Sequence, residues 1–177
     1  KEFGINRKRI YQRYSHEIAK ISNKNEILAE FNAIWQSDVR KKNLVSIVIL
    51  TFNQLKYTRE CVESIRKHTP EPHEIIFVDN GSKDGTVKWL RRLVKDNPNY
   101  KLIENRENVG FARGCNQGIE ASSGEYILLL NNDVVVTEDW LAGMLECLNS
   151  SPDIGIVGPM TNNISGPQKV DSVSYSS

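Results

Sequence analysis

Apolar positions in the first part of the chain recur with a helical period. Ile10, Tyr14, Ile18 and Ile21 step by three or four positions, and a second stripe contains Ile27, Leu28, Phe31, Ile34 and Trp35. Such spacing is typical of amphipathic helices. The polar stretch "SNKN" separates the two stripes. We therefore predict a helical extension over residues 1–43.

Beyond this boundary, short apolar runs alternate with segments of helical period. Strands are expected in "LVSIVIL", "HEIIFVD", "KLIEN", "EYILLLN" and "DIGIVGP". Helices are expected over Lys56–His68 and in "GTVKWLRRLVKD", "FARGCNQGIEAS" and "TEDWLAGMLECLNS". This alternation predicts an α/β domain over residues 44–177, a mostly parallel, Rossmann-like sheet with helices on both faces. The closing stretch "TNNISGPQKVDSVSYSS" lacks periodicity and is expected to be a flexible tail.

Charge adds a second difference between the two parts. Residues 1–44 hold 10 Lys and Arg against 5 Asp and Glu, a net charge of +5, whereas the remainder carries −4. Basic amphipathic helices can lie on an anionic membrane surface or dock a protein partner. The alternative is an ordinary extension that packs on the next domain with a solvated basic face.

Composition excludes several classes of protein. The 177 residues are 39% hydrophobic and 25% charged, which predicts one domain with its own core rather than a disordered chain. The apolar runs are too short to cross a bilayer, so we expect a cytoplasmic protein that is at most peripheral to a membrane. We also expect no nucleic-acid partner. Three cysteines without CxxC spacing support neither a disulfide framework nor a zinc site.

Polar residues collect where the expected strands end. Ligands of open parallel sheets bind beyond the carboxyl ends of the strands, so these residues are candidates for one site. Each could instead cap a helix or close a turn, as "DGT" at Asp84–Thr86 suggests. The candidates are Thr51 and Asn53 after the first strand, Asp79 after the second, and Asn131, Asn132 and Asp133 after the fourth.

The chemistry of these residues suits a phosphorylated ligand. Neither G-x-G-x-x-G nor a P-loop is present, so phosphate charge must be neutralised in another way. Asp133 is the candidate ligand for Mn²⁺ or Mg²⁺, and Asn131 and Asn132 could add hydrogen bonds without adding charge. Asp79 could accept a hydrogen bond from a nucleobase or sugar, and Arg113 could supply a cation.

Four ordered motifs give the chain a resemblance to a known family. "VSIVILTFN", "EIIFVDNGSKDGT", "NRENVGFARGCNQGI" and "GEYILLLNNDVVVTEDWL" resemble the successive motifs of family 2 inverting glycosyltransferases with the GT-A fold. The resemblance covers about Val45 to Pro159. It implies that Thr51 and Asn53 line a nucleotide pocket, that Asp79 reads a pyrimidine base, and that Gly110 and Arg113 close over the base and pyrophosphate.

The triplet Asn131–Asp133 matches the position of the family's DXD motif, although its first residue is Asn rather than Asp. The resemblance implies that Asp133 binds Mn²⁺ or Mg²⁺ bridging the diphosphate, that Asn131 contacts the ribose, and that Asn132 belongs to the same nucleotide-sugar site. It further implies transfer of a sugar from a nucleotide-diphosphate donor, with UDP- and dTDP-sugars favoured. The acceptor would be a hydroxyl of a glycan or lipid-linked molecule, as in cell-surface polysaccharide synthesis.

The general base that inversion requires has no match in the sequence. In the family this carboxylate follows the fifth strand, and neither Asp153 nor Asp171 falls in a matching motif. We therefore expect the donor-binding half of a catalytic domain, with the base beyond Ser177. The alternative is a non-catalytic module that binds a nucleotide sugar or serves as a scaffold. A nucleotidyltransferase is disfavoured because "TFNQLKYTRE" lacks the glycine-rich loop such enzymes need.

Overall fold

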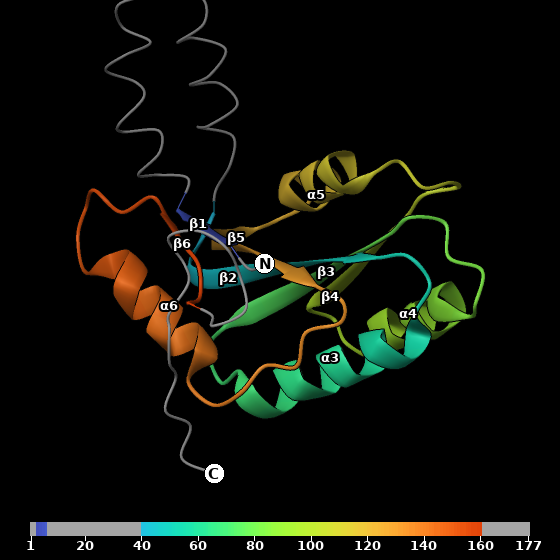
Figure 1. Ribbon diagram of the computed structural model, residues 1–177, viewed down its shortest axis with the longest axis horizontal. Helices are drawn as coiled ribbons and strands as arrows, with labels where there is room; N and C mark the ends of the chain where they lie inside the picture. The colour runs from blue at the N-terminus through green and yellow to red at the C-terminus, as the bar shows by residue number, and fades with distance from the viewer. Residues whose placement is uncertain (1–2, 7–39, 161–177) are drawn as a thin grey trace, which may run out of the picture.

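The structure, a computed structural model, describes residues 3–6 and 40–160 of the chain (Figure 1). These residues form one sheet with the strand order β4-β3-β2-β5-β1-β6. The strands are β1 (Phe3–Asn6), β2 (Lys41–Thr51), β3 (His73–Asp79), β4 (Tyr100–Glu104), β5 (Gly124–Asn131) and β6 (Ile156–Val157). The helices are α3 (Leu55–His68), α4 (Thr86–Lys95), α5 (Phe111–Glu120) and α6 (Trp140–Asn149).

Four neighbouring strands, β4, β3, β2 and β5, run parallel and form the centre of the domain. In β2, Ile47 pairs with Ile75 of β3 on one side and with Leu128 of β5 on the other. Both neighbours of β2 are therefore present, and its apolar run is buried, as expected of an inner parallel strand. The prediction of a mostly parallel α/β sheet is confirmed.

The other end of the sheet is antiparallel. β1 lies between β5 and β6 and pairs with both, through Phe3 with Leu129 and Gly4 with Val157. Residues 3–6 therefore form a strand rather than part of a helical extension, because pairing with two distant strands decides their conformation. The helices expected within residues 7–39, and the tail at residues 161–177, lie outside the described residues.

Helices cover both faces of the sheet, as predicted (Figure 1). α3, α4 and α6 pack on one face, where Ile65, Leu90 and Leu141 join the core with Ile47 and Phe77 of the strands. α5 packs on the opposite face, over a smaller cluster of buried residues: Val48, Ile76, Val78 and Ile127. None of the helices in this part of the chain is long and apolar enough to span a bilayer.

Two glycines bring α5 unusually close to the sheet. A Cβ atom on Gly114 would lie 2.4 Å from Leu50 Cδ1, and one on Gly118 would lie 2.2 Å from Val48 Cγ1. Both distances are far below van der Waals contact. At Gly118, which meets the β-branched Val48, only glycine permits this approach, whereas at Gly114 the end of the Leu50 side chain would have to move. The helix that carries Arg113 is thereby seated directly on β2.

A buried polar cluster closes the sheet where its parallel strands begin. Glu74 is 5% exposed, and its Oε1 accepts hydrogen bonds from Ser46 Oγ at 2.6 Å and from Ser123 N and Oγ at 2.6 and 2.9 Å. Lys101 Nζ lies 2.9 Å from Glu74 Oε2. Burial alone would raise the pKa of Glu74, but the hydrogen bonds from Ser46, Ser123 and Lys101 outweigh it and the pKa is lowered.

Candidate functional site

The polar strand ends predicted from the sequence meet at one edge of the sheet. From β2 the chain proceeds to β3 and β4 on one side, and then returns to β5 on the other side of β2. Strand order therefore reverses at β2, the position where open α/β sheets bind ligands. Thr51 pairs in register with Asp79, and Leu50 pairs with Asn131.

Asp79 is completely buried at this edge and fully hydrogen-bonded. Its Oδ1 accepts from Gly81 N at 3.0 Å and Ser82 N at 2.8 Å, and its Oδ2 accepts from Thr51 Oγ1 at 2.9 Å and Ser82 Oγ at 2.5 Å. The carboxylate thus shapes the turn after β3 and ties it to β2. Because both oxygens are engaged within the protein, direct reading of a base by Asp79 stays a prediction that would require these bonds to rearrange.

Asn53 links the loops that follow β2 and β3. Its N–H donates to Ser82 Oγ at 2.6 Å, and its side-chain oxygen accepts from Lys83 N at 2.8 Å. Asn53 and Gln54 both adopt left-handed backbone conformations, with φ of 59° and 63°. Two consecutive non-glycine residues in this region are strained, and such strain often accompanies functional loops.

Asp84 joins the beginnings of two helices at the same edge. It accepts hydrogen bonds from Leu55 N of α3 at 2.9 Å and from Thr86 N and Oγ1 of α4 at 3.1 and 2.6 Å. Burial would raise the pKa of Asp84, but the bonds from Thr86 and Leu55 outweigh it and the pKa is lowered. The turn and helix start predicted at Asp84–Thr86 are confirmed.

A network of neutral amides fixes the loop between β4 and α5. Asn80 is 2% exposed, accepts from Asn105 Nδ2 at 2.9 Å, and donates to Asn108 Oδ1 at 3.3 Å and to the carbonyl of Gly110 at 3.4 Å. Asn105 and Gln117 exchange two further bonds of 2.8 and 2.9 Å. Asn80 lies beside Asp79 among the polar residues at the end of the second expected strand, but the sequence alone indicates no individual role for it.

The amide network places the segment that carries Gly110 and Arg113. Gly110 has a φ of 87° and precedes the first residue of α5, so the chain turns sharply there. Arg113 lies exposed in the first turn of that helix. Its contact with a base or phosphate stays a prediction.

The triplet Asn131–Asp133 begins on the last residue of β5 and continues into a turn. Val134 N donates to the carbonyl of Asn131 at 3.4 Å, and Asn132 Nδ2 donates to Thr58 Oγ1 of α3 at 3.0 Å. Asp133 is exposed. Within the described ranges, no group of three or more His, Cys, Asp and Glu side chains could hold a metal ion by itself. One carboxylate beside neutral amides fits Mg²⁺ or Mn²⁺ whose remaining ligands are phosphate oxygens and water.

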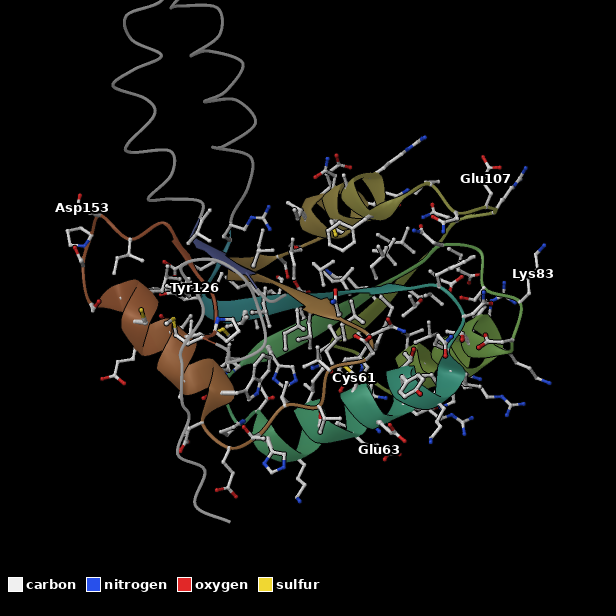
Figure 2. The ribbon with its side chains drawn as sticks, in the orientation of Figure 1. Cys61, Glu63, Lys83, Glu107, Tyr126 and Asp153 are labelled. Atoms are coloured by element: carbon white, nitrogen blue, oxygen red, sulfur yellow. The ribbon has the colours of Figure 1, made fainter. Side chains whose placement is uncertain are left out.

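The structure joins three of the predicted residues in one hydrogen-bonded unit. Thr51 Oγ1 donates directly to Asp79, and Ser82 links Asp79 to Asn53. Figure 2 shows Lys83 and Glu107, from the loops after β3 and β4, at one end of the molecule, and Asp153 at the opposite end. Asp153 is therefore remote from the loops of the candidate site, while Asp171 lies outside the described residues.

Comparison with known proteins identifies relatives among glycosyltransferases. An uncharacterised glycosyltransferase of Haemophilus influenzae is 30% identical over 115 residues, covering 65% of this chain and 36% of that protein. The putative glycosyltransferase EpsH of Bacillus subtilis is 33% identical over 112 residues, covering 63% and 32%. The poly-β-1,6-N-acetyl-D-glucosamine synthase of Staphylococcus aureus is 26% identical over 136 residues, covering 75% and 33%. The chain thus spans about a third of the length of these relatives.

Solved structures share the fold. Residues 1–349 of Staphylococcus aureus TarS, in complex with UDP-GlcNAc, align with a TM-score of 0.52 and 23% identity over 59% of this chain and 31% of that one. The mannosyltransferase PcManGT of Pyrobaculum calidifontis, in complex with GDP-Man and Mn²⁺, aligns with a TM-score of 0.56 and 22% identity over 80% and 43%. The model of glycosyl transferase family 2 matches residues 46–172, which is well over half of the sequence. The chain therefore belongs to glycosyl transferase family 2.

Proposed function

We propose that this chain provides the nucleotide-sugar-binding part of a metal-dependent glycosyltransferase that transfers a sugar to an acceptor hydroxyl with inversion. The observation that carries the proposal is the meeting of the polar ends of β2, β3 and β5 where the strand order reverses. Family membership supports glycosyl transfer as the chemistry. The activity of the whole protein is part of the proposal, because the chain spans about a third of its relatives.

The described residues divide the work of donor binding. The loops held by Asn53 and Asp79 form the nucleotide side of the site, with Thr51 between them. Arg113, at the start of α5, contributes a cation towards the base or pyrophosphate. Asp133, with Asn131 beside it, holds Mn²⁺ or Mg²⁺. The cation, when bound, stabilises negative charge on the departing diphosphate.

The donor is proposed to be a UDP- or dTDP-sugar, and the acceptor a glycan or a lipid-linked molecule. Support for UDP comes from TarS, whose structures include complexes with UDP and UDP-GlcNAc, whereas PcManGT was solved with GDP-Man. A role in polysaccharide synthesis is supported by one relative, the poly-β-1,6-N-acetyl-D-glucosamine synthase. The same proposal places the protein in the cytoplasm and gives residues 1–43 a contact with a membrane or a protein partner. It also places the general base outside the described residues.

Titration calorimetry of the 177-residue chain with UDP, dTDP and GDP, each with and without Mn²⁺, tests this function. We expect Mn²⁺ to strengthen UDP binding by about tenfold or more, equivalent to roughly 1.4 kcal/mol. Asp133→Ala should abolish this dependence, and Asp133→Asn should keep the fold but lose most of the metal affinity. Asp153→Asn, an exposed aspartate at the opposite end of the molecule, is the matched control.

Three outcomes would contradict parts of the proposal. Unchanged Mn²⁺ dependence in Asp133→Ala would remove Asp133 from the metal site. Tight UDP binding by the wild-type chain without any metal would instead favour a nucleotide-sugar-binding module that performs no transfer. Stronger binding of GDP than of UDP or dTDP would refute the pyrimidine preference.

A further inference from the structure

Helix α3 and the residue that follows it present a row of small polar side chains to the segment that leaves β5. This segment runs along α3 before it enters α6 (Figure 1), and Cys61 lies midway along the helix (Figure 2). We name the row the α3 ladder: Thr58, Cys61, Ser64 and Thr69. Its contacts are Asn132 Nδ2 to Thr58 Oγ1 at 3.0 Å, Cys61 Sγ to Asn131 O at 3.7 Å, Val136 N to Ser64 Oγ at 3.1 Å, and Trp140 Nε1 to Thr69 Oγ1 at 3.0 Å.

The ladder begins at the turn that contains Asp133. Thr58, Cys61 and Ser64 are three residues apart, so they lie on one face of the helix, and all are buried. The first two contact Asn131 and Asn132, which immediately precede Asp133. The later members hold residues farther along the segment. The start of the ladder is therefore the part that can influence a metal ion at Asp133.

Thr58 is suited to hold Asn132 in one orientation. Its hydroxyl donates to the carbonyl of Gln54 at 3.3 Å and accepts from Asn132 Nδ2 at 3.0 Å, and its side chain is fully buried. Because its single hydrogen is directed to Gln54, the oxygen can only accept from Asn132. The amide nitrogen of Asn132 therefore faces α3, whereas Asp133 is exposed.

We infer that Thr58 and Asn132 are positioning residues whose hydrogen bond fixes the turn that presents Asp133 to a divalent cation. This inference rests on the proposed function and deepens it. It gives Asn132 a different role from the donor contact implied by resemblance, because its amide anchors the turn. It also connects the two sides of the candidate site, since Gln54 belongs to the loop after β2 and Asn132 follows β5.

A double-mutant cycle on Thr58 and Asn132 tests the inference, with Mn²⁺ affinity measured by electron paramagnetic resonance in the presence of UDP. Losing one hydrogen bond should weaken Mn²⁺ binding about fivefold in Thr58→Val and in Asn132→Ala. The double variant should be no weaker than either single variant, because both remove the same interaction. Thr58→Ser keeps the hydroxyl and should retain affinity within about twofold of the wild type.

Ser64→Ala is the matched control from the same ladder. It leaves the N–H of the buried Val136 without its hydrogen-bond acceptor, so it should lower the melting temperature. Its Mn²⁺ affinity should stay within about twofold of the wild type. A second readout needs no metal, namely amide hydrogen exchange of residues 131–134. Exchange there should accelerate in Thr58→Val but not in Thr58→Ser.

Different results would contradict the role of Thr58 and the proposed metal-dependent function. Wild-type affinity for Mn²⁺ in Thr58→Val would overturn the inference and leave the proposed function intact. Multiplying losses in the double variant would show that Asn132 acts independently of Thr58, which also overturns it. If the wild-type chain bound no Mn²⁺, the proposed metal dependence would fail, and unchanged hydrogen exchange in Thr58→Val would reject the anchor as well.

Discussion

Replacing Glu74 with glutamine tests the buried cluster where the parallel strands begin. The carboxylate accepts three hydrogen bonds at Oε1 and faces Lys101 Nζ with Oε2. The amide of the introduced glutamine can still offer one acceptor oxygen, but its NH₂ group would then face the ammonium of Lys101, a second donor. We therefore expect the variant to fold with a lower free energy of unfolding.

The size of the loss follows from the burial of the cluster. Hydrogen bonds to a charged group contribute about 1.5–3 kcal/mol each, but a neutral glutamine retains part of the Oε1 contacts. Lys101 is 42% exposed, so solvent screens its ion pair and this share is small. We expect a loss of about 2 kcal/mol near neutral pH, from the weakened bonds of Ser46 and Ser123.

The stability lost in Glu74→Gln should depend on pH, and it should decrease as the solution becomes acidic. The pKa of Glu74 is lowered in the folded protein from its ordinary value of 4.5, so the carboxylate stabilises the fold fully above that value. This contribution disappears as the pH falls through the folded-state pKa. The difference in unfolding free energy between wild type and Glu74→Gln should therefore be largest near pH 7 and shrink as the pH falls below 4.5.

Urea denaturation of both proteins across this range measures the difference directly. Glu146→Gln, an exposed glutamate on α6, is the control and should change stability by less than about 0.5 kcal/mol. An equal difference at neutral and acidic pH would refute the reasoning. A loss below about 0.5 kcal/mol near pH 7 would show that Glu74 contributes no more than a surface residue.

Two further substitutions, with a third as a control, test the backbone around the candidate site by the same denaturation method. Gln54→Gly should stabilise the fold by about 0.5–1 kcal/mol, because glycine adopts the φ of 63° without strain, and a loss of stability would show that the side chain matters instead. Gly118→Ala should cost about 1–3 kcal/mol, since its Cβ would lie 2.2 Å from Val48 Cγ1. Gly143→Ala in α6, where a Cβ meets nothing within 4 Å, should instead be neutral or stabilising, and equal effects at both glycines would contradict the packing argument.

Much of the fold could be predicted because apolar residues recur with a clear strand or helix period in the elements that form the core. The β3 strand has the expected bounds, His73–Asp79, and α3 differs from the expected helix by one residue. β1 could not be predicted, because four residues carry too little periodicity and the strand exists only through pairing with β5 and β6. Pairing between segments so distant in sequence is a tertiary effect that local patterns do not encode.

The candidate site was predictable in its location but not in how its atoms are used. Parallel strands place Thr51, Asp79 and Asn131 at one edge, which follows from topology alone. That Asp79 is saturated by four donors depends on the turn after β3, which the sequence does not specify. The role of Thr58 could not be predicted, because its hydrogen-bond partner, Asn132, lies 74 residues away in the sequence.

The position of β1 has a consequence for how the domain assembles. β1 pairs with β5 on one side and is the strand that connects β6 to the sheet, so almost the whole domain separates it from its partners. Closing so long a loop carries the largest entropic cost of any pairing in the sheet, and such non-local contacts slow folding. During synthesis, residues 3–6 leave the ribosome before the other strands but find both partners only after β6 has emerged. Until β1 joins it, β5 exposes an unpaired edge, and β1 in turn exposes an edge until β6 pairs with it, so the nascent domain is vulnerable to mispairing with other chains.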